Sequence, residues 1–285
     1  MSNTTTINSE LFQNLLVQSQ FALYENSIAR AVSTVFDYPT NAGKVVSVPV
    51  WAGITSSKPG EGVAPSQADT NTTSKTITLE EHVAYAQVTD FLRDSAQEDV
   101  ISSLASQMGL ALAEGLDKEL IALFASVTQS VGTAATGSPL VKVDNTVNDL
   151  MKAAAIIRAN KYQGPLFAVL NPMQAFGLKA ALTATNNFQS VSNIGNEALS
   201  QYFIGQIAGI TILEHALVAV DGTSKDAVGC VFAPQAFGIA QRGGVAMETQ
   251  REAAARATDV VMSVVAGAGI LRPEMAVKVI GNGEV

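Results

Sequence analysis

The stretch SAQEDVISSLASQMGLALAEGLDKELIALFASV, residues 95–127, carries one uninterrupted amphipathic helix pattern. Ser95 and Glu98 form a capping box, in which each side chain satisfies a backbone amide at the start of a helix. Apolar residues then recur every three or four positions, which favours one buried helical face. They are Ile101, Leu104, Met108, Leu112, Leu116, Leu120, Leu123 and Val127. We predict a single helix over 95–128, about 50 Å long at 1.5 Å per residue.

The length of this helix is its informative feature, because core helices of ordinary α+β domains show the same pattern at about a third of the length. Gly109 and Gly115 lie inside it, although glycine lowers the stability of a helix interior. We therefore expect a neighbouring backbone to approach the helix closely at these two positions.

On the N-terminal side of the helix, the sequence predicts an arm and a long β-ribbon. Residues 7–35 show helical spacing and end in a turn at 38–43. Residues 44–51, KVVSVPVW, alternate with period two, and a second alternating strand runs to about Asp90. The apolar residues of that second strand are an even number of positions apart, which would place them on one face of a continuous strand. They are Ile77, Leu79, Val83 and Tyr85. The polar segment 53–74 between the strands is longer than compact domains usually tolerate. Such a ribbon has no core of its own, so we expect it to lie on another subunit.

On the C-terminal side, the pattern changes to a mixed lobe of helices and strands. We predict helices over 146–161 and from Pro172 to about Leu182, and a short helix opened by Pro234. The expected strands of the lobe are 166–170, 202–204, 210–213 and 228–233. Three closing strands follow, which we expect to pair as a sheet beside the long helix: 245–250, 259–266 and 275–280.

Composition restricts the class of partner. Of the 285 residues, only 15% are charged and 47% are hydrophobic, whereas soluble domains average roughly 25% charged residues. Such a surface suits burial against copies of the same chain. The net charge of -8 argues against a site that grips phosphates, so any contact with nucleic acid should be weak and non-specific. The sequence shows no secretory signal and no apolar run of about 18 residues, so we expect no membrane contact.

The residues that usually carry chemistry are sparse. The two histidines are His82, which we expect on the polar side of the ribbon, and His215. A zinc site needs three or four clustered ligands, and the single cysteine, Cys230, is near neither histidine in the sequence. Gly267-Ala268-Gly269 is a fragment of a dinucleotide-binding motif without the helix that should follow. We predict no catalytic, cofactor-binding or metal residue, and no enzyme activity.

Charged residues of the ribbon and of the closing strands are candidates for contacts between subunits. Arg251 and Arg256 either lie on a solvated stretch or meet acidic groups of a neighbour's ribbon. The candidates are Lys58, Glu61, Asp69, Lys75, Arg251 and Arg256.

Short local motifs accompany these parts in a fixed order. They are Gly43-Lys44, Glu61-Gly62, Thr76–Leu79, Asp99-Val100, Ala111–Asp117, Leu170–Pro172, Ile204–Ile210, Phe237–Ala240 and Arg272–Glu274. With an arm, a hairpin loop, a spine helix, a central lobe and a returning sheet, the chain resembles the major capsid proteins of tailed bacteriophages of the Hong Kong phage type. The resemblance spans nearly the whole sequence.

The resemblance implies an α+β fold with an N-terminal arm, an extended loop, a peripheral domain with the spine helix, and an axial domain. It further implies pentamers and hexamers that tile an icosahedral shell around double-stranded DNA. Portal, scaffolding and cement or decoration proteins are implied partners, and the location is the capsid of a virion made in the host cytoplasm. We expect a separate scaffold because the N-terminal segment is short. No residue is assigned to a covalent crosslink.

The implied division follows the predicted elements. It is 1–43 for the arm, 44–90 for the extended loop and first peripheral strand, 91–132 for the spine helix, 133–241 for the axial domain and 242–285 for the closing peripheral strands.

Three other functions remain open from the sequence. An encapsulin-type compartment shell shares the implied fold, a tail or surface-layer component would also be structural, and an enzyme of unknown class would need a converging pair of catalytic residues.

Overall fold

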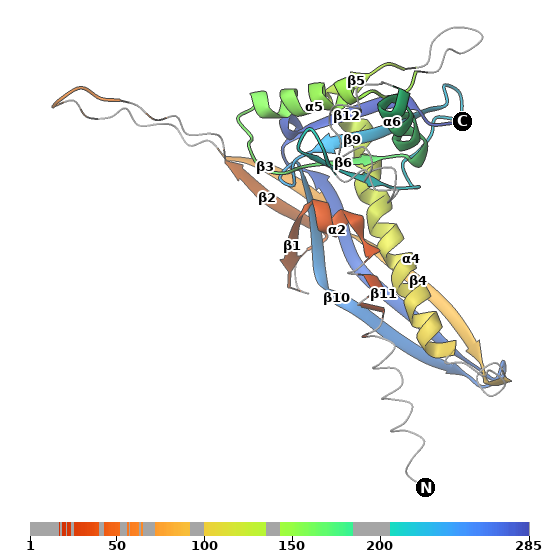
Figure 1. Ribbon diagram of the computed structural model, residues 1–285. Helices are drawn as coiled ribbons and strands as arrows, with labels where there is room; N and C mark the ends of the chain where they lie inside the picture. The colour runs from red at the N-terminus through yellow and green to blue at the C-terminus, as the bar shows by residue number, and fades with distance from the viewer. Residues whose placement is uncertain are drawn as a thin grey trace.

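In the computed structural model, a compact lobe sits at one end of an elongated part, and a hairpin projects from the region where they meet (Figure 1). The described residues are 17, 19–20, 22–23, 26–39, 43–51, 56, 58–62, 64, 72–91, 100–134, 143–184 and 206–284.

The elongated part is a four-stranded sheet with a long helix on one face (Figure 1). The strand order is β1-β10-β11-β4, with β1 parallel to β10 and the other neighbours antiparallel. The elements are β1 Thr34–Tyr38, β4 Glu80–Thr89, α4 Val100–Ala122, β10 Phe237–Glu252 and β11 Ala257–Ile270. A short helix, α2 Ile28–Val32, precedes β1 and contacts α4.

The lobe is built on a six-stranded mixed sheet with the order β5-β12-β9-β6-β8-β7. Helices α5 and α6 pack against it. The elements are β5 Ser130–Gly132, α5 Val147–Ala159, β6 Leu166–Leu170, α6 Pro172–Ala184, β7 Gln206–Ile207, β8 Ile210–Glu214, β9 Asp226–Phe232 and β12 Ala276–Asn282.

The predicted ribbon is present as a separate two-stranded hairpin. Strands β2 Val45–Trp51 and β3 Thr72–Thr78 pair antiparallel from Val45 with Thr78 to Trp51 with Thr72. The hairpin leaves the body instead of folding back onto it (Figure 1). This arrangement is the extended ribbon that the sequence predicts.

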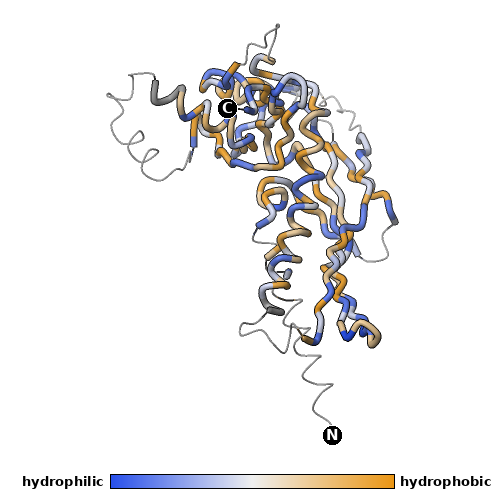
Figure 2. The backbone as a smooth tube through the Cα atoms, turned by 90° about the vertical axis from the view of Figure 1, so that its right-hand side faces the viewer, coloured by the Kyte–Doolittle hydropathy of each residue, from blue (hydrophilic) through white to orange (hydrophobic). Residues whose placement is uncertain are grey.

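Helix α4 confirms the predicted spine over the described part. Met108, Leu112, Leu116 and Leu120 are buried, and hydrophobic and hydrophilic residues alternate along the helix (Figure 2). The α-helix ends earlier than predicted, at Ala122, because the chain tightens into a 3-10 turn, Leu123–Ser126. The capping box at Ser95 and Glu98 lies outside the described residues.

Both glycines of α4 lie at close approaches, but the predicted approach of a neighbouring backbone is confirmed only at Gly109. A Cβ at Gly109 would lie 2.4 Å from the backbone oxygen of Ser19, and one at Gly115 would lie 3.0 Å from Nδ1 of His82. At Gly109 the neighbour is backbone, whereas at Gly115 it is an imidazole ring.

The end of α4 enters the core of the lobe and joins the two parts of the molecule. Phe124, Phe232 and Phe237 are fully buried. The rings of Phe232 and Phe237 pack edge to face with centroids 4.9 Å apart, and Phe124 lies 5.8 and 5.7 Å from them. These rings come from the turn after α4, from β9 in the lobe and from β10 in the long sheet. Their contact therefore fixes the lobe on the elongated part.

Four predictions of local structure were wrong. The helical arm does not continue to residue 35, because Thr34–Tyr38 form β1 and pair with β10. The last closing strand, β12, pairs with β9 and β5 in the lobe, not with β10 or β11. Pro234 begins a turn, not a helix. The apolar residues of the second ribbon strand do not share one face, because the chain changes sheets between β3 and β4.

Candidate functional site

Large apolar side chains are exposed on the hairpin and on the outer face of β4. Trp51 of β2 is 59% exposed, and Val83 and Tyr85 of β4 are 54% and 61% exposed. The inward residues of the same strand, Ala84 and Ala86, pack against the cluster beneath α4. Strand β4 thus carries apolar side chains on both faces, which is typical of strands that are covered on both sides, and the described residues cover only the inner face.

The root of the hairpin is packed on the body by a cluster of its own. Val46, Val48, Ile77 and Leu79 are buried there against Ala240 and Leu271. The amide of Leu79 donates to the carbonyl of Lys44 across the two hairpin strands, at 2.8 Å. The hairpin is therefore anchored by apolar contacts at its base, while its far part projects.

Two glycines of β11 provide the space for this root. A Cβ at Gly267 would lie 2.0 Å from the carbonyl oxygen of Thr78, and one at Gly269 would lie 2.7 Å from Cγ1 of Ile77. The hairpin backbone therefore crosses β11 directly over Gly267. The Gly267-Ala268-Gly269 run serves this crossing.

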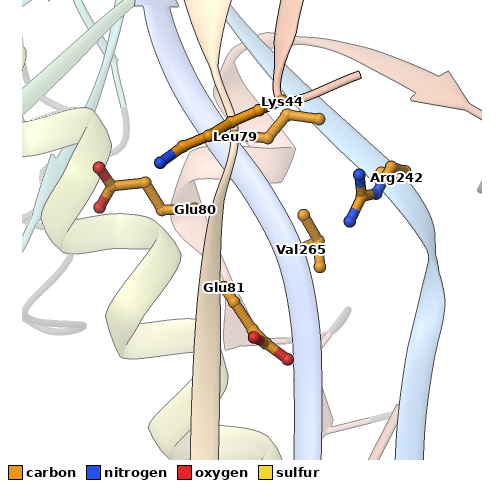
Figure 3. A pocket seen from close by; sticks show the side chains of 6 residues that line it. All are labelled: Lys44, Leu79, Glu80, Glu81, Arg242 and Val265. Atoms are coloured by element: carbon orange, nitrogen blue, oxygen red, sulfur yellow. The ribbon is translucent and has the colours of Figure 1, made fainter. Parts of the chain in front are cut away.

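A pocket of about 470 Å³ lies at the same crossing. It is lined by Lys44, Leu79, Glu80, Glu81, Arg242 and Val265 (Figure 3). The ammonium group of Lys44 and the carboxylate of Glu80 lie on one side of the view, and the guanidinium of Arg242 lies on the other (Figure 3). Two cations and two carboxylates balance each other, and this set contains no nucleophile paired with a base.

His82 points inward from β4, not to the polar side of the ribbon as predicted. Its Nε2 lies 2.9 Å from Oε1 of Glu119 on α4, although its N–H is not aligned with that oxygen. The Glu119 carboxylate raises the pKa of His82 above its ordinary 6.5, and Glu80 adds to the effect, while partial burial acts against it. The other oxygen of Glu119 accepts a hydrogen bond from the amide of Ala268, at 3.1 Å.

His215 meets a second acid of the same helix, Asp117, which is buried. Oδ1 of Asp117 accepts hydrogen bonds from the Ser27 hydroxyl at 2.9 Å and the Ala29 amide at 2.8 Å, and Oδ2 accepts one from the Ile28 amide at 3.2 Å. Nε2 of His215 lies 3.4 Å from Oδ2. Asp117 thus joins the start of α2, the spine helix and the lobe. Sequence reasoning missed this junction because its partners are far apart in the chain.

The candidate contact residues occupy distant parts of the fold. Lys58 and Glu61 are exposed on the segment between β2 and β3, Lys75 is half-buried on β3, and Asp69 lies outside the described residues. Within one chain Lys58, Glu61 and Lys75 are not brought to the two arginines, Arg251 and Arg256, which lie at the far end of the β10–β11 pair (Figure 1). Their role between subunits stays a prediction.

Arg251 is engaged within its own chain. Its Nη1 and Nη2 donate to the two carboxylate oxygens of Asp90, at 2.7 and 2.6 Å. Arg256 is exposed in the turn between β10 and β11, at a positive φ of 49°. Its carbonyl accepts the amide of Asp90, at 2.9 Å. These contacts hold the strands together at the distal tip.

Among the residues described, no three His, Cys, Asp or Glu side chains come together to hold a metal ion. Cys230 is fully buried, and this burial raises the pKa of its thiol. None of the helices in the described ranges is both long and apolar enough to cross a membrane.

The fold is similar to that of solved phage and phage-like capsids. The sequence model of a family described as phage capsid protein matches residues 72–279. Among solved structures, the capsid of cyanophage P-SCSP1u matches with a TM-score of 0.65 and 20% identity, over 88% of this chain and 87% of that one. A chain from Mycobacterium phage Che8 matches with a TM-score of 0.63 and 17% identity, over 84% and 85%. The capsid of an empty GTA particle matches with a TM-score of 0.64 and 16% identity, over 90% of each chain. No curated protein sequence matches.

Proposed function

The chain belongs to the phage capsid protein family, and from this premise we infer that it is the major capsid protein of a tailed phage. Its copies assemble through pentamers and hexamers into the icosahedral head shell that encloses the DNA. The projecting hairpin supports assembly with other copies independently of the family match. Its root is buried in the chain's own core, while Trp51 at the end of β2 is left 59% exposed. Exposed aromatic residues of this kind are typical of surfaces that another protein covers.

We propose the same five parts of the chain, with two changes that the sheet pairing supports. Strand β1 belongs with the peripheral sheet because it pairs with β10, and β12 belongs with the axial lobe because it pairs with β9. The arm is otherwise 1–43, the extended loop and first peripheral strand 44–90, the spine 91–132, the axial domain 133–241 and the closing peripheral strands 242–285.

We propose a structural role without catalysis, in the capsid shell, for a protein made in the host cytoplasm. The net charge of -8 supports a weak, non-specific contact with packaged DNA, because DNA carries the same sign of charge. We propose portal, scaffolding and cement or decoration proteins as further partners of this shell. Lys58, Glu61, Asp69 and Lys75 are proposed contacts on the ribbon, and Arg251 and Arg256 are proposed at the distal tip.

Removal of residues 56–72 tests the role of the hairpin. We expect a soluble, folded chain that forms no closed shells, because the root cluster stays while the projecting part is lost. The readouts are circular dichroism for the fold and electron microscopy for particles. A matched control is Gly222→Ala in the lobe, where an added Cβ would meet nothing within 4 Å; this variant should assemble as the original does. Normal shells from the shortened chain would contradict the proposal.

A further inference from the structure

The hairpin and β4 are consecutive parts of one chain segment, and the sheet is interrupted where they separate. The last pair between β11 and β4 is Ala266 with Glu80. If the register continued, Thr78 would face Ala268, but Thr78 pairs with Val45 in the hairpin instead. The Ala268 amide therefore has no strand partner on this side, and an unpaired backbone amide in a sheet is costly.

Glu119 of α4 takes the place of the missing strand. Its Oε2 accepts the Ala268 amide at 3.1 Å, so that a carboxylate from the spine helix completes the ladder at the branch point. The side chain of Glu119 is only 23% exposed. The contact couples the helix to the strand segment over which the hairpin crosses.

Nε2 of His82 lies 2.9 Å from the other oxygen of the same carboxylate, so that the two groups form an ion pair when His82 is charged. The charged groups that act on His82 are Glu119 from α4 and Glu80 from its own strand. Its partner on β11 is Val264, which cannot titrate. Gly115 of α4 leaves the imidazole room beside the helix, because a Cβ there would lie 3.0 Å from Nδ1.

We propose that His82 and Glu119 form a proton-controlled latch that sets how firmly the hairpin root is held on the body. Charged His82 orients Glu119 toward the Ala268 amide, and the branch point is then closed. When His82 loses its proton, the ionic attraction that orients Glu119 is lost, and the amide exchanges its carboxylate partner for water more readily.

The direction with pH follows from the raised pKa of His82. A histidine whose folded-state pKa is raised contributes stability that is fully present below its ordinary 6.5. That contribution is lost as the pH rises through the folded-state value. The latch is therefore tight in mild acid and weaker in mild base.

Hydrogen–deuterium exchange of the full-length protein tests the latch. Peptides that cover 77–82 and 266–270 are followed from about pH 6 to about pH 9 and normalised to the unfolded chain at each pH. We expect normalised exchange at Ala268 to rise with pH by a factor on the order of ten, as for loss of one hydrogen bond to a charged group. His82→Gln should show no such rise, since glutamine does not titrate in this range.

His215→Gln is the matched control, because His215 also meets an acid of α4 but lies in the lobe. This variant should keep the rise with pH. A flat profile in the original protein, or an unchanged rise in His82→Gln, would overturn the latch. If His82→Gln does not fold, Glu119→Gln decides the matter. Its amide oxygen can still accept from Ala268 without a charge, so the pH dependence should vanish, and its persistence would also overturn the proposal.

Discussion

Gly267→Ala should lift the root of the hairpin from the body. The added Cβ would lie 2.0 Å from the carbonyl oxygen of Thr78, whereas carbon and oxygen atoms in contact lie about 3.3–3.6 Å apart. The obstacle is backbone, so no side-chain rotation relieves it. The carbonyl has to move by more than about 1 Å. Such a shift disturbs the root cluster around Ile77 and Leu79 and the bond from Leu79 to Lys44.

We expect Gly267→Ala to lower the free energy of unfolding by about 2–3 kcal/mol, as overpacking of a buried site does. Gly244→Ala in β10 is the matched control, because its Cβ would meet only Nε2 of Gln20, at 3.9 Å. Its unfolding free energy should not fall. The assay is urea denaturation of the unassembled chains, followed by circular dichroism. Equal stability of the two variants, within about 0.5 kcal/mol, would refute the argument that the hairpin backbone rests on Gly267.

Three further predictions concern the core and the junctions. Phe232→Ala should reduce the free energy of unfolding by about 3–5 kcal/mol, because the ring is fully buried between Phe124 and Phe237. Denaturant titration measures this free energy, and a loss below about 1 kcal/mol would contradict the packing described. Asp117→Asn should lower the free energy of unfolding by about 1–3 kcal/mol, since an amide nitrogen would replace one of two oxygens that accept hydrogen bonds. Limited proteolysis should show faster cleavage near α2, and unchanged cleavage would count against the junction. Cys230 should resist iodoacetamide in the folded chain and react after unfolding, because burial raises the pKa of its thiol and the thiolate is the reactive form. Mass spectrometry detects the adduct, and rapid labelling of the native protein would contradict the burial.

The spine helix and the hairpin could be predicted from the sequence because each depends on a local period. The apolar positions of α4, such as Leu112 and Leu116, face one cluster along the described helix. The strands β2 and β3 follow from alternation and a polar connection. In both cases, neighbouring residues in the sequence determine which face is buried.

The alternation of apolar residues no longer predicts the buried face beyond Leu79, where the chain passes from one sheet to another. Ile77 and Leu79 are buried at the hairpin root, but Val83 and Tyr85, in step with them, are exposed on β4. A change of sheet resets which side is inward, as a shift in register does. Nothing within the segment marks that change, since both strands alternate normally.

Pairings between distant segments could not be predicted for a related reason. Strand β1 pairs with β10 some 200 residues away, as Thr34 with Gly238, and β12 joins β9 in the lobe. The strand pattern of each segment does not specify its sheet. Likewise, the roles of Asp117 and Glu119 depend on residues that reach α4 from distant segments, so the sequence around them does not indicate these roles.

The tripeptide Gly267-Ala268-Gly269 shows how one short segment sets the angle of the hairpin. Its two glycines leave room for the backbone of Thr78 and the side chain of Ile77. The amide between them is held by Glu119 from the spine helix. A tilt of the hairpin therefore has to displace backbone resting on the glycines and strain the contact at Ala268 as well. Because these contacts share one strand segment, their effects on stability should not be additive. The small residues are needed for the crossing, because a Cβ at either glycine would collide with the hairpin.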